Sequence, residues 1–219
     1  LFILEDGAQG FGGMIGNKRA CSFGDISTTS FFPAKPLGCY GDGGAVFTDN
    51  DEWAALADSY RVHGKGMFKY DNVRIGMNSR LDTLQAAILK IKFKAFREYE
   101  LRDINKAAAL YTKLLAGRVK TPVTPEGYYS SWAQYTICLN SREERDALQA
   151  CLKEQGIPSM VYYPTPMHGQ TAYKALNAPT DCCPTAKRLC DTVLSLPVHP
   201  YITEEEIETV CSVILGFVR

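Results

Sequence analysis

The fold is decided by residues 25–48, which read Asp25-Ile26-Ser27-Thr28-Thr29-Ser30-Phe31-Phe32-Pro33-Ala34-Lys35-Pro36-Leu37-Gly38-Cys39-Tyr40-Gly41-Asp42-Gly43-Gly44-Ala45-Val46-Phe47-Thr48. Residues 25–32 are rich in β-branched and aromatic side chains, which favour a strand. Pro33 stops that strand because proline has no N–H to donate. Gly43-Gly44 precedes a second predicted strand over residues 45–48. The stretch therefore predicts two strands joined by a stiff, glycine-containing connection.

A third strand is predicted upstream, over the apolar run Leu1–Leu4, which ends at Glu5 and Asp6. Such a run is typical of a strand buried on both faces, and a strand of that kind needs neighbours in a sheet. The run has no polar lead-in and no initiator methionine. We therefore expect the chain to be the C-terminal fragment of a longer protein.

Helices are predicted downstream of these strands. Asp49 or Asn50 can cap a helix that extends to about Tyr60, and residues 63–78 are irregular. A long helix is predicted from Leu81 to about Leu115, because apolar residues recur at helical spacing along one face. That face comprises Leu81, Leu84, Ile88, Ile91 and Ala95. The other face is basic and is either solvated or a partner surface; it comprises Lys90, Lys92, Lys94 and Arg97.

The remainder of the chain alternates strands and helices after a boundary at residues 121–127. The predicted elements are a strand over 133–139, a helix with a capping box at Ser141 and Glu144, a short strand near Ile157, a helix over 184–193, and a helix with a capping box at Thr203 and Glu206 that ends near Phe217. This alternation indicates an α/β or α+β architecture.

Composition excludes several classes of protein. The 219 residues include 24 Lys plus Arg and 24 Asp plus Glu, so the net charge is zero. A nucleic-acid binder or a polybasic membrane binder would need a positive excess. The sequence contains no run of 18 apolar residues, so no transmembrane helix is predicted. The N-terminus lacks the features of a signal peptide.

The cysteines and histidines give no recognisable metal motif. Eight cysteines occur without a Cys-x-x-Cys pair, and the adjacent Cys182-Cys183 lacks the usual spacing of a zinc site. His63, His168 and His199 fit no short metal-binding pattern. Four disulfides are the alternative, but we expect reduced thiols in a cytoplasmic protein, and no metal site.

Two residues stand where an imine-forming enzyme would need them. Lys35 lies between Pro33 and Pro36, so its backbone is stiff, and its apolar neighbours favour the neutral amine, which is the nucleophilic form. Asp6 ends a predicted strand, where α/β sheets place ligand contacts, and Gln9 follows closely enough to join the same site. An exposed loop lysine and a turn aspartate are the alternatives. Gly41–Gly44 can expose N–H groups to an anion or form a plain hairpin turn.

Together these segments resemble the DegT/DnrJ/StrS family of pyridoxal-phosphate sugar aminotransferases over essentially the whole chain. The matching motifs, in order, are Glu5-Asp6-Gly7-Ala8-Gln9, Ser22-Phe23-Gly24-Asp25, Ser30–Lys35, Gly41–Ala45, Arg61-Val62-His63-Gly64, Asn78–Asp82, Gln85-Ala86-Ala87 and Leu196–Pro200. The resemblance implies an α/β, fold type I aminotransferase. Residues 1–120 would form part of the large domain, with a mixed, mostly parallel sheet and the long connecting helix. Residues 121–219 would form a smaller α+β domain.

The resemblance assigns roles to individual residues. Lys35 matches the lysine that bonds covalently to pyridoxal 5'-phosphate, Asp6 the acid on its pyridine nitrogen, and Gln9 the glutamine near its phenolic oxygen. Ser30 matches a phosphate ligand. Asn78 matches an asparagine that reaches the phosphate in the neighbouring subunit, which implies a homodimer with a shared active site. Three positions match segments that face substrate: Arg80, Tyr162 and His168.

The implied reaction moves an amino group from an amino acid, expected to be glutamate, to a nucleotide-linked ketosugar. Residues 31–44 are most similar to members that aminate UDP-2-acetamido-2-deoxy-3-oxo-glucuronate for bacterial surface polysaccharides such as lipopolysaccharide. The alternatives are a sugar dehydratase on the same scaffold and a non-catalytic regulatory relative. The upstream part of the family pattern is absent, so this fragment alone is expected to hold the cofactor weakly or not at all and to be inactive by itself. Relatives carry His-Tyr-Pro where this chain has Tyr162-Tyr163-Pro164.

Overall fold

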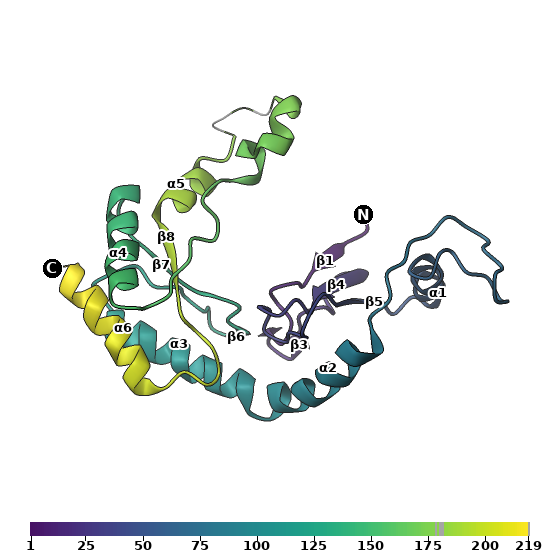
Figure 1. Cartoon of the computed structure of the whole chain (residues 1–219), viewed down its shortest axis with the longest axis horizontal. Coiled ribbons are helices and arrows are strands. Elements are labelled where there is room, and N and C mark those ends of the chain that lie inside the picture. The colour runs from purple at the N-terminus through teal and green to yellow at the C-terminus, as the bar shows by residue number, and fades with distance from the viewer. Residues whose placement is uncertain (178, 180–181, 219) are drawn as a thin grey trace. The chain divides into compact units, whose positions relative to one another are not determined.

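The computed structural model describes residues 1–177, 179 and 182–218. Figure 1 draws its helices and strands. The chain divides into two compact units, each described here by itself. The first unit comprises residues 1–102 and 124–133, and the second comprises residues 103–123 and 134–219.

A mixed three-stranded sheet organises the first unit. Its strands, in spatial order, are β1 (Leu4–Asp6), β4 (Ile26–Ser30) and β5 (Gly44–Phe47). β1 and β4 are parallel, with Asp6 opposite Thr28. β4 and β5 are antiparallel, with Ser30 opposite Gly44. The predicted strands over 25–32 and 45–48 are thus confirmed. The sheet is mixed, as expected, with one parallel and one antiparallel pair rather than mostly parallel.

The N-terminal run is not buried, which corrects the prediction for Leu1–Leu4. The side chains of Phe2 and Leu4 are 83% and 67% exposed, and only Leu4 of this run belongs to β1. The reason is that β1 is an edge strand, paired with β4 alone among the described strands. One neighbouring strand cannot cover both faces of the run.

The core of the first unit lies between the sheet and the long helix. Its buried members are Phe31, Leu37, Cys39, Leu89, Phe96 and Leu101. The Phe11 ring stacks on that of Phe96 with centroids 6.0 Å apart, so residues after β1 pack on the helix. A second small sheet, not predicted from the sequence, has the order β3 (Lys18–Arg19), β2 (Met14–Ile15) and β6 (Tyr128–Tyr129).

The predicted helices of the first half form with small differences. α1 (Asp51–Tyr60) is capped by Asn50, whose Oδ1 accepts the Trp53 N–H at 3.0 Å. The long helix is continuous to Leu115, but it is built from α2 (Thr83–Ala95), a π-helical turn η1 (Phe96–Glu100) and α3 (Leu101–Leu115).

The apolar face predicted for this helix is largely exposed. Leu84 and Ile91 are 78% and 77% exposed, whereas Leu89 and Phe96, seven residues apart, are buried. The reason is that the helix contacts the core of the first unit through the stripe carrying Leu89 and Phe96. The predicted face is therefore wrong. Lys90, by contrast, is solvated, as one interpretation of the basic face expected.

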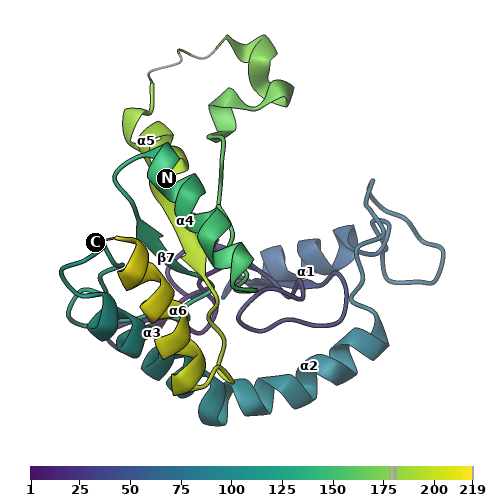
Figure 2. The same ribbon diagram turned by 60° about the vertical axis from the view of Figure 1, so that its left-hand side comes forward.

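The second unit is an α+β arrangement around a two-stranded antiparallel sheet. Its elements are β7 (Tyr135–Cys138), α4 (Arg142–Glu154), the 3-10 helices η2 (Met167–Gly169) and η3 (Thr171–Leu176), α5 (Pro184–Thr192), β8 (Val193–Leu196) and α6 (Glu204–Phe217). α4 packs against α5, α6 and β8, and Figure 2 shows α4 beside α6. The fully buried side chains of its core include Tyr111, Tyr135, Ile137, Leu148, Leu152, Leu194 and Ile214.

The caps of the second unit follow the sequence closely. Ser141 Oγ accepts the Glu144 N–H at 3.2 Å, but the Glu144 carboxylate accepts the N–H of Asn140, so only half of that predicted capping box forms. The capping box of Thr203 and Glu206 is complete. The strand expected near Ile157 is reduced to an isolated bridge at Met160.

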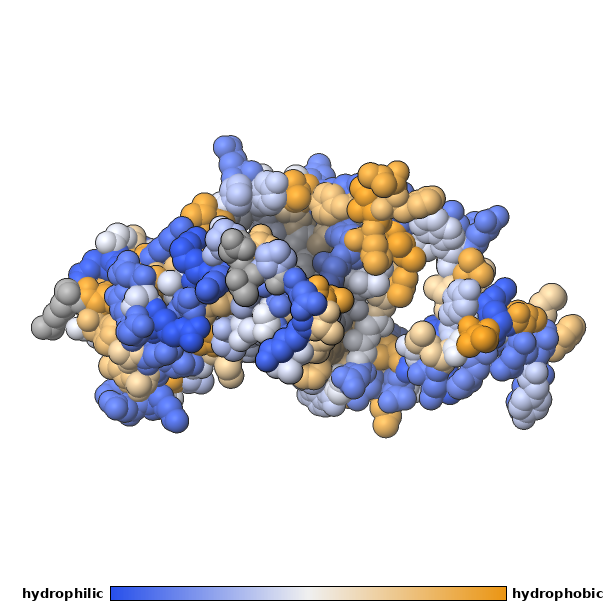
Figure 3. Space-filling model, turned by 90° about the horizontal axis from the view of Figure 1, so that it is seen from above, coloured by the Kyte–Doolittle hydropathy of each residue, from blue (hydrophilic) through white to orange (hydrophobic). Residues whose placement is uncertain are grey.

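Apolar side chains are open to solvent over much of the chain. Figure 3 shows orange hydrophobic groups among the blue hydrophilic ones on one face. The most exposed include Leu1, Met67 and Ile75, each above 90%. Among the helices in the described part of the chain, none has both the length and the apolar character that a bilayer crossing requires.

Candidate functional site

The carboxyl ends of two parallel strands place Asp6 and Ser30 at one edge of the sheet. Asp6 ends β1 and Ser30 ends β4. The Asp6 side chain is fixed locally because its Oδ1 accepts the Ala8 N–H at 3.0 Å. Ser30 Oγ accepts the Phe32 N–H at 3.2 Å. Asp6 is exposed and Ser30 is half-buried, so this edge presents a carboxylate and a hydroxyl to a ligand.

Gln9 lies in the turn that follows β1. The Gly10 N–H donates to the Gly7 carbonyl at 3.0 Å, which closes the turn. The Gln9 carbonyl accepts the Ser131 hydroxyl at 3.1 Å, so the backbone that carries the Gln9 side chain is tied down from a distant part of the sequence. The side chain itself is exposed.

Lys35 is held on a compact loop that follows β4. Its N–H donates to the Phe32 carbonyl at 2.9 Å, and the Cys39 N–H donates to the Phe31 carbonyl at 2.7 Å. Gly38 closes this loop, because a Cβ at that position would lie only 2.5 Å from the Pro33 carbonyl oxygen. The Lys35 side chain is half-buried. The backbone that carries the amine is therefore as rigid as the two flanking prolines predict.

The glycine-rich turn after this loop is anchored by the long helix. The Tyr40 N–H donates to Gln85 Oε1 at 2.8 Å, and a Cβ at Gly41 would lie 3.0 Å from Gln85 Nε2. The buried Cys39 thiol donates to the carbonyls of Phe31 and Gly41. The turn thus returns the chain to β5 with little freedom of its own.

Asn78 and Arg80 are directly bonded to each other. Arg80 donates from Nε and Nη2 to Asn78 Oδ1, at 2.9 and 2.7 Å. Because both donors use the amide oxygen, the amide NH₂ of Asn78 points away from the guanidinium and can donate to another group. Both side chains are exposed.

The same two residues line a cavity in the first unit. It has a volume of about 1090 Å³ and also touches Thr28, Gly44 and Asp58. Asp58 accepts charged hydrogen bonds from Arg61 and Lys65, and these partners hold its pKa below the ordinary value. Lys35, Asp6, Gln9 and Ser30 are not among the described residues that line this cavity.

Glu5 fixes the segment that returns the chain to β4, a role that the sequence did not indicate. Its carboxylate accepts the N–H groups of Cys21, Phe23 and Gly24 at 2.6, 2.7 and 3.2 Å. Desolvation raises the pKa of this carboxyl, but the three N–H donors outweigh it, so the pKa is lowered overall. Glu5 therefore orders the residues beside Asp6.

Tyr162 and His168 belong to the second unit. Tyr162 is exposed, and its ring meets that of Tyr163 edge-on with centroids 5.4 Å apart. His168 lies in η2 and is half-buried. Tyr162 and His168 are thus described within the second unit, one exposed and the other half-buried.

The donor set of the first unit fits a phosphorylated pyridine aldehyde. A carboxylate at Asp6 suits a pyridinium N–H, a hydroxyl at Ser30 suits a phosphate, and the Lys35 amine suits an aldehyde carbon. Gln9, in the turn after β1, carries an exposed amide. The structure places Asp6 at the end of β1, Ser30 at the end of β4 and Lys35 on the loop that follows β4, and it bonds Asn78 to Arg80.

Two positioning features were missed by sequence reasoning. The close backbone approach at Gly38 was not predicted from the sequence. The position of this glycine two residues after Pro36 could have indicated a tight loop. Glu5 precedes Asp6, and the sequence predicted a functional role for Asp6 only. Its bonds to residues 21–24 depend on tertiary contacts that no local pattern reveals.

Comparisons with known proteins identify the family of the chain. The sequence profile of the DegT/DnrJ/EryC1/StrS aminotransferase family matches residues 1–215. The chain is similar to the UDP-2-acetamido-2-deoxy-3-oxo-D-glucuronate aminotransferase of Pseudomonas aeruginosa, with 42% identity over 96% of this chain and 56% of that protein. It is equally similar to the pleiotropic regulatory protein of Geobacillus stearothermophilus, with 42% identity over 100% of this chain and 59% of that protein.

A solved structure gives the same picture. The crystal structure of a DegT DnrJ EryC1 StrS aminotransferase from Brucella abortus superposes with a TM-score of 0.94 at 47% identity, over 100% of this chain and 57% of that one. The chain therefore spans little more than half the length of the proteins it matches. The expected partial fold type I architecture is confirmed. The chain belongs to the DegT/DnrJ/EryC1/StrS aminotransferase family.

Proposed function

We propose that the protein is a pyridoxal-phosphate-dependent aminotransferase that acts on a nucleotide-linked ketosugar. One observation carries the proposal: the amine of Lys35 sits on a rigid loop directly after β4, whose parallel neighbour β1 ends in the carboxylate of Asp6. Aminotransferases of this family use pyridoxal 5'-phosphate. The donor set of the first unit supplies a partner for each of its polar groups.

Each residue would hold a different part of the cofactor. Asp6 would pair with the pyridine nitrogen and keep a proton on it, Gln9 would contact the phenolic oxygen, and Ser30 would contact the phosphate. Lys35 would form the covalent bond. When bound, pyridoxal phosphate supplies an aldehyde carbon and an electron-accepting ring.

Lys35 would also move the proton on which the transfer depends. As a free amine, Lys35 would take the proton from the α-carbon of the amino-acid substrate, and over the whole reaction it would deliver a proton to the sugar carbon that receives the amino group. The exchange needs no external oxidant, because an amino acid becomes a 2-oxo acid while a ketosugar becomes an aminosugar. Two substrates that react in turn on one site give ping-pong kinetics.

The substrate proposal is more specific. Glutamate would be the amino donor and UDP-2-acetamido-2-deoxy-3-oxo-glucuronate the acceptor, which would place the enzyme in the synthesis of bacterial surface polysaccharides such as lipopolysaccharide. The similarity to the Pseudomonas aeruginosa aminotransferase supports this choice. Arg80, Tyr162 and His168 are the proposed substrate contacts, and the proposed location is the cytoplasm.

The active site would be shared between two copies of the chain. Asn78 is exposed, and Arg80 occupies its amide oxygen, so its amide NH₂ is presented outward as a donor. In a homodimer this donor would reach the phosphate in the neighbouring subunit. Residues 1–120 would supply the cofactor-binding part and residues 121–219 the smaller domain.

The regulatory alternative has a specific observation in its favour, the similarity to the Geobacillus stearothermophilus regulatory protein. Against it, a protein with no catalytic duty has no physical need for both the Lys35 amine and the Asp6 carboxylate. A sugar dehydratase on the same scaffold remains the other alternative, and product analysis separates it from a transaminase.

The deciding experiment is a pyridoxal-phosphate titration with borohydride reduction and mass spectrometry. We expect a visible absorption band that glutamate bleaches, and a reduced cofactor adduct on Lys35. Lys35→Ala should lose both, whereas Lys94→Ala, which removes an exposed amine, should retain both. Identical spectra and labelling for the protein and Lys35→Ala would overturn the catalytic proposal.

A further inference from the structure

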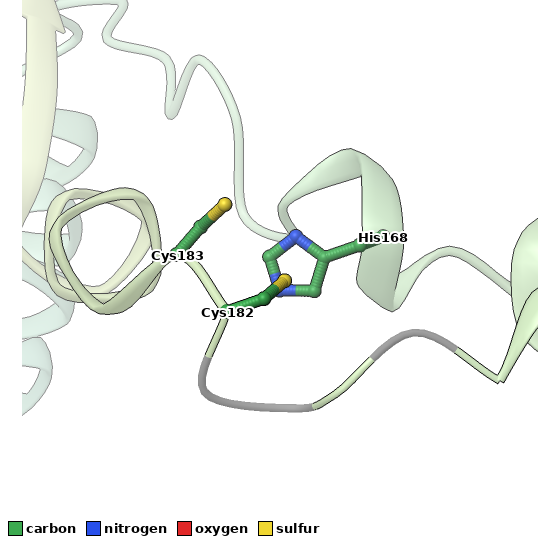
Figure 4. A group of neighbouring side chains, drawn as sticks. All are labelled: His168, Cys182 and Cys183. Carbon is green, nitrogen blue, oxygen red and sulfur yellow. The ribbon is translucent and has the colours of Figure 1, made fainter.

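Three side chains of the second unit that can bind a metal ion lie close together. They are His168, Cys182 and Cys183, and a ligand atom from each lies within 4.8 Å of the other two. Figure 4 shows the imidazole and the two thiols turned toward one another. His168 comes from η2, whereas Cys183 is the residue that precedes α5. Sequence analysis predicted no metal site here, because a histidine fourteen residues before an adjacent cysteine pair matches no short zinc motif.

The backbone on both sides of the cluster is ordered by local hydrogen bonds. The Gly169 N–H donates to the Pro166 carbonyl at 2.9 Å, which fixes the turn that carries His168. Pro184 begins α5, and the Lys187 N–H donates to the Cys183 carbonyl at 3.1 Å. The cysteine pair is therefore set by a helix start and the histidine by a 3-10 turn, so neither end depends on a ligand for its conformation.

The distances between the ligand atoms fit tetrahedral coordination of a metal ion if these atoms move slightly closer together. Zinc binds thiolates at about 2.3 Å and imidazole nitrogen at about 2.0–2.1 Å, which puts neighbouring ligand atoms roughly 3.5–3.8 Å apart in a tetrahedron. The separations in the structure are at most 4.8 Å. Rotation of exposed cysteine side chains covers a difference of about 1 Å at low energetic cost.

The donor chemistry selects the class of ion. Two thiolates and one imidazole form a soft to borderline set, which favours Zn²⁺ over the hard cations Mg²⁺ and Ca²⁺. Both cysteines are exposed and His168 is half-buried, so water has access to a fourth position. Binding would release the thiol protons, because the ligand is the thiolate.

We propose that His168, Cys182 and Cys183 form a Zn²⁺ site with water as the fourth ligand. The ion would link the start of α5 to η2. It would also occupy one ring nitrogen of His168. His168 is also a proposed substrate contact, but the zinc site does not depend on the aminotransferase proposal, because it rests on the spacing of the three ligand atoms.

The test uses Co²⁺ as a spectroscopic probe on the reduced 219-residue chain without pyridoxal phosphate, under anaerobic conditions. We expect one equivalent of Co²⁺ to give a thiolate charge-transfer band, and one equivalent of Zn²⁺ to abolish it. Cys182→Ser, Cys183→Ser and His168→Gln should each weaken Zn²⁺ binding by at least about tenfold. Cys151→Ser, a half-buried cysteine on α4, should leave it unchanged.

A second measurement on the unaltered chain guards against variants that fail to fold. Zn²⁺ should protect Cys182 and Cys183 from alkylation, as read by peptide mass spectrometry, and it should leave the labelling of Cys151 as it was. The proposal is overturned if no thiolate band forms, if the band persists in the Cys182→Ser/Cys183→Ser variant, or if Zn²⁺ does not protect the pair.

Discussion

The guanidinium of Arg80 holds the amide oxygen of Asn78 through two hydrogen bonds, from Nε at 2.9 Å and from Nη2 at 2.7 Å. This pairing settles which end of the Asn78 amide is available to a ligand. The oxygen is taken, so the NH₂ group is the end that an anion would meet. Arg80 thus acts on Asn78 as a positioning residue, besides its proposed contact with substrate.

Arg80→Lys should weaken pyridoxal-phosphate binding, because a lysine ammonium cannot make the paired contact with the amide oxygen. Both residues are exposed, so we expect a loss of only about 0.5–1.5 kcal/mol, which is about 2–10-fold in Kd. Asn78→Ala should weaken binding by itself and should remove most of the effect of Arg80→Lys. Additive losses in this double-mutant cycle, measured by cofactor titration, would show that the two residues act separately.

Asp6→Asn should preserve the covalent bond at Lys35 and slow the transfer of the amino group. The substituted amide keeps the Oδ1 acceptor for the Ala8 N–H, so the turn after β1 should survive. What is lost is a charged partner for the pyridine nitrogen, an interaction of about 1.5–3 kcal/mol, or roughly 10–200-fold in rate. Single-turnover kinetics with glutamate measure the rate, and borohydride labelling confirms the bond. Unchanged turnover would remove Asp6 from its proposed role.

Gly38→Ala should disturb the loop that carries Lys35. The new Cβ would lie 2.5 Å from the Pro33 carbonyl oxygen and 2.8 Å from that of Phe32, and backbone atoms cannot give way cheaply. We expect a loss of about 1–3 kcal/mol in the free energy of unfolding and weaker labelling of Lys35. Denaturant unfolding and borohydride labelling measure the two effects.

The matched control is Gly216→Ala in α6. A Cβ at Gly216 has no heavy atom within 4 Å, and alanine favours a helix by up to about 1 kcal/mol over glycine. Stability should therefore stay constant or rise. Equal behaviour of the two variants would mean that the close approach at Gly38 has no consequence.

The sequence predicted those elements whose signals are local. Pro33 after a β-branched run located the end of β4, and the Thr203–Glu206 pair located the start of α6, because each signal acts within one turn or strand end. The family motifs assign roles to Asp6 and Lys35, and these roles stay predictions.

The sequence could not predict features that depend on distant contacts. Whether Leu1–Leu4 is buried depends on which strands flank β1, and which face of the long helix is buried depends on where Leu89 and Phe96 meet the core. The π-helical turn at Phe96–Glu100 likewise has no sequence signal that separates it from α-helix. Burial was therefore assigned incorrectly, from a continuous apolar run for Leu1–Leu4 and from periodicity for the long helix.

Glu206 makes the stability of α6 depend on pH in a defined window. Its pKa is lowered from 4.5 because the Thr203 N–H donates to the carboxylate, with help from the Thr203 hydroxyl. A lowered native pKa means that this stabilisation is complete above the unfolded value and is lost as the pH falls through the native value. Glu206→Gln should therefore be less stable than the unaltered chain at neutral pH, with the difference shrinking below about pH 4.5. Glu208→Gln, which changes an exposed acid two residues later in the same helix, provides the control. Denaturant unfolding followed by circular dichroism across this range measures the difference, and a gap that widens on acidification would contradict the capping role of Glu206.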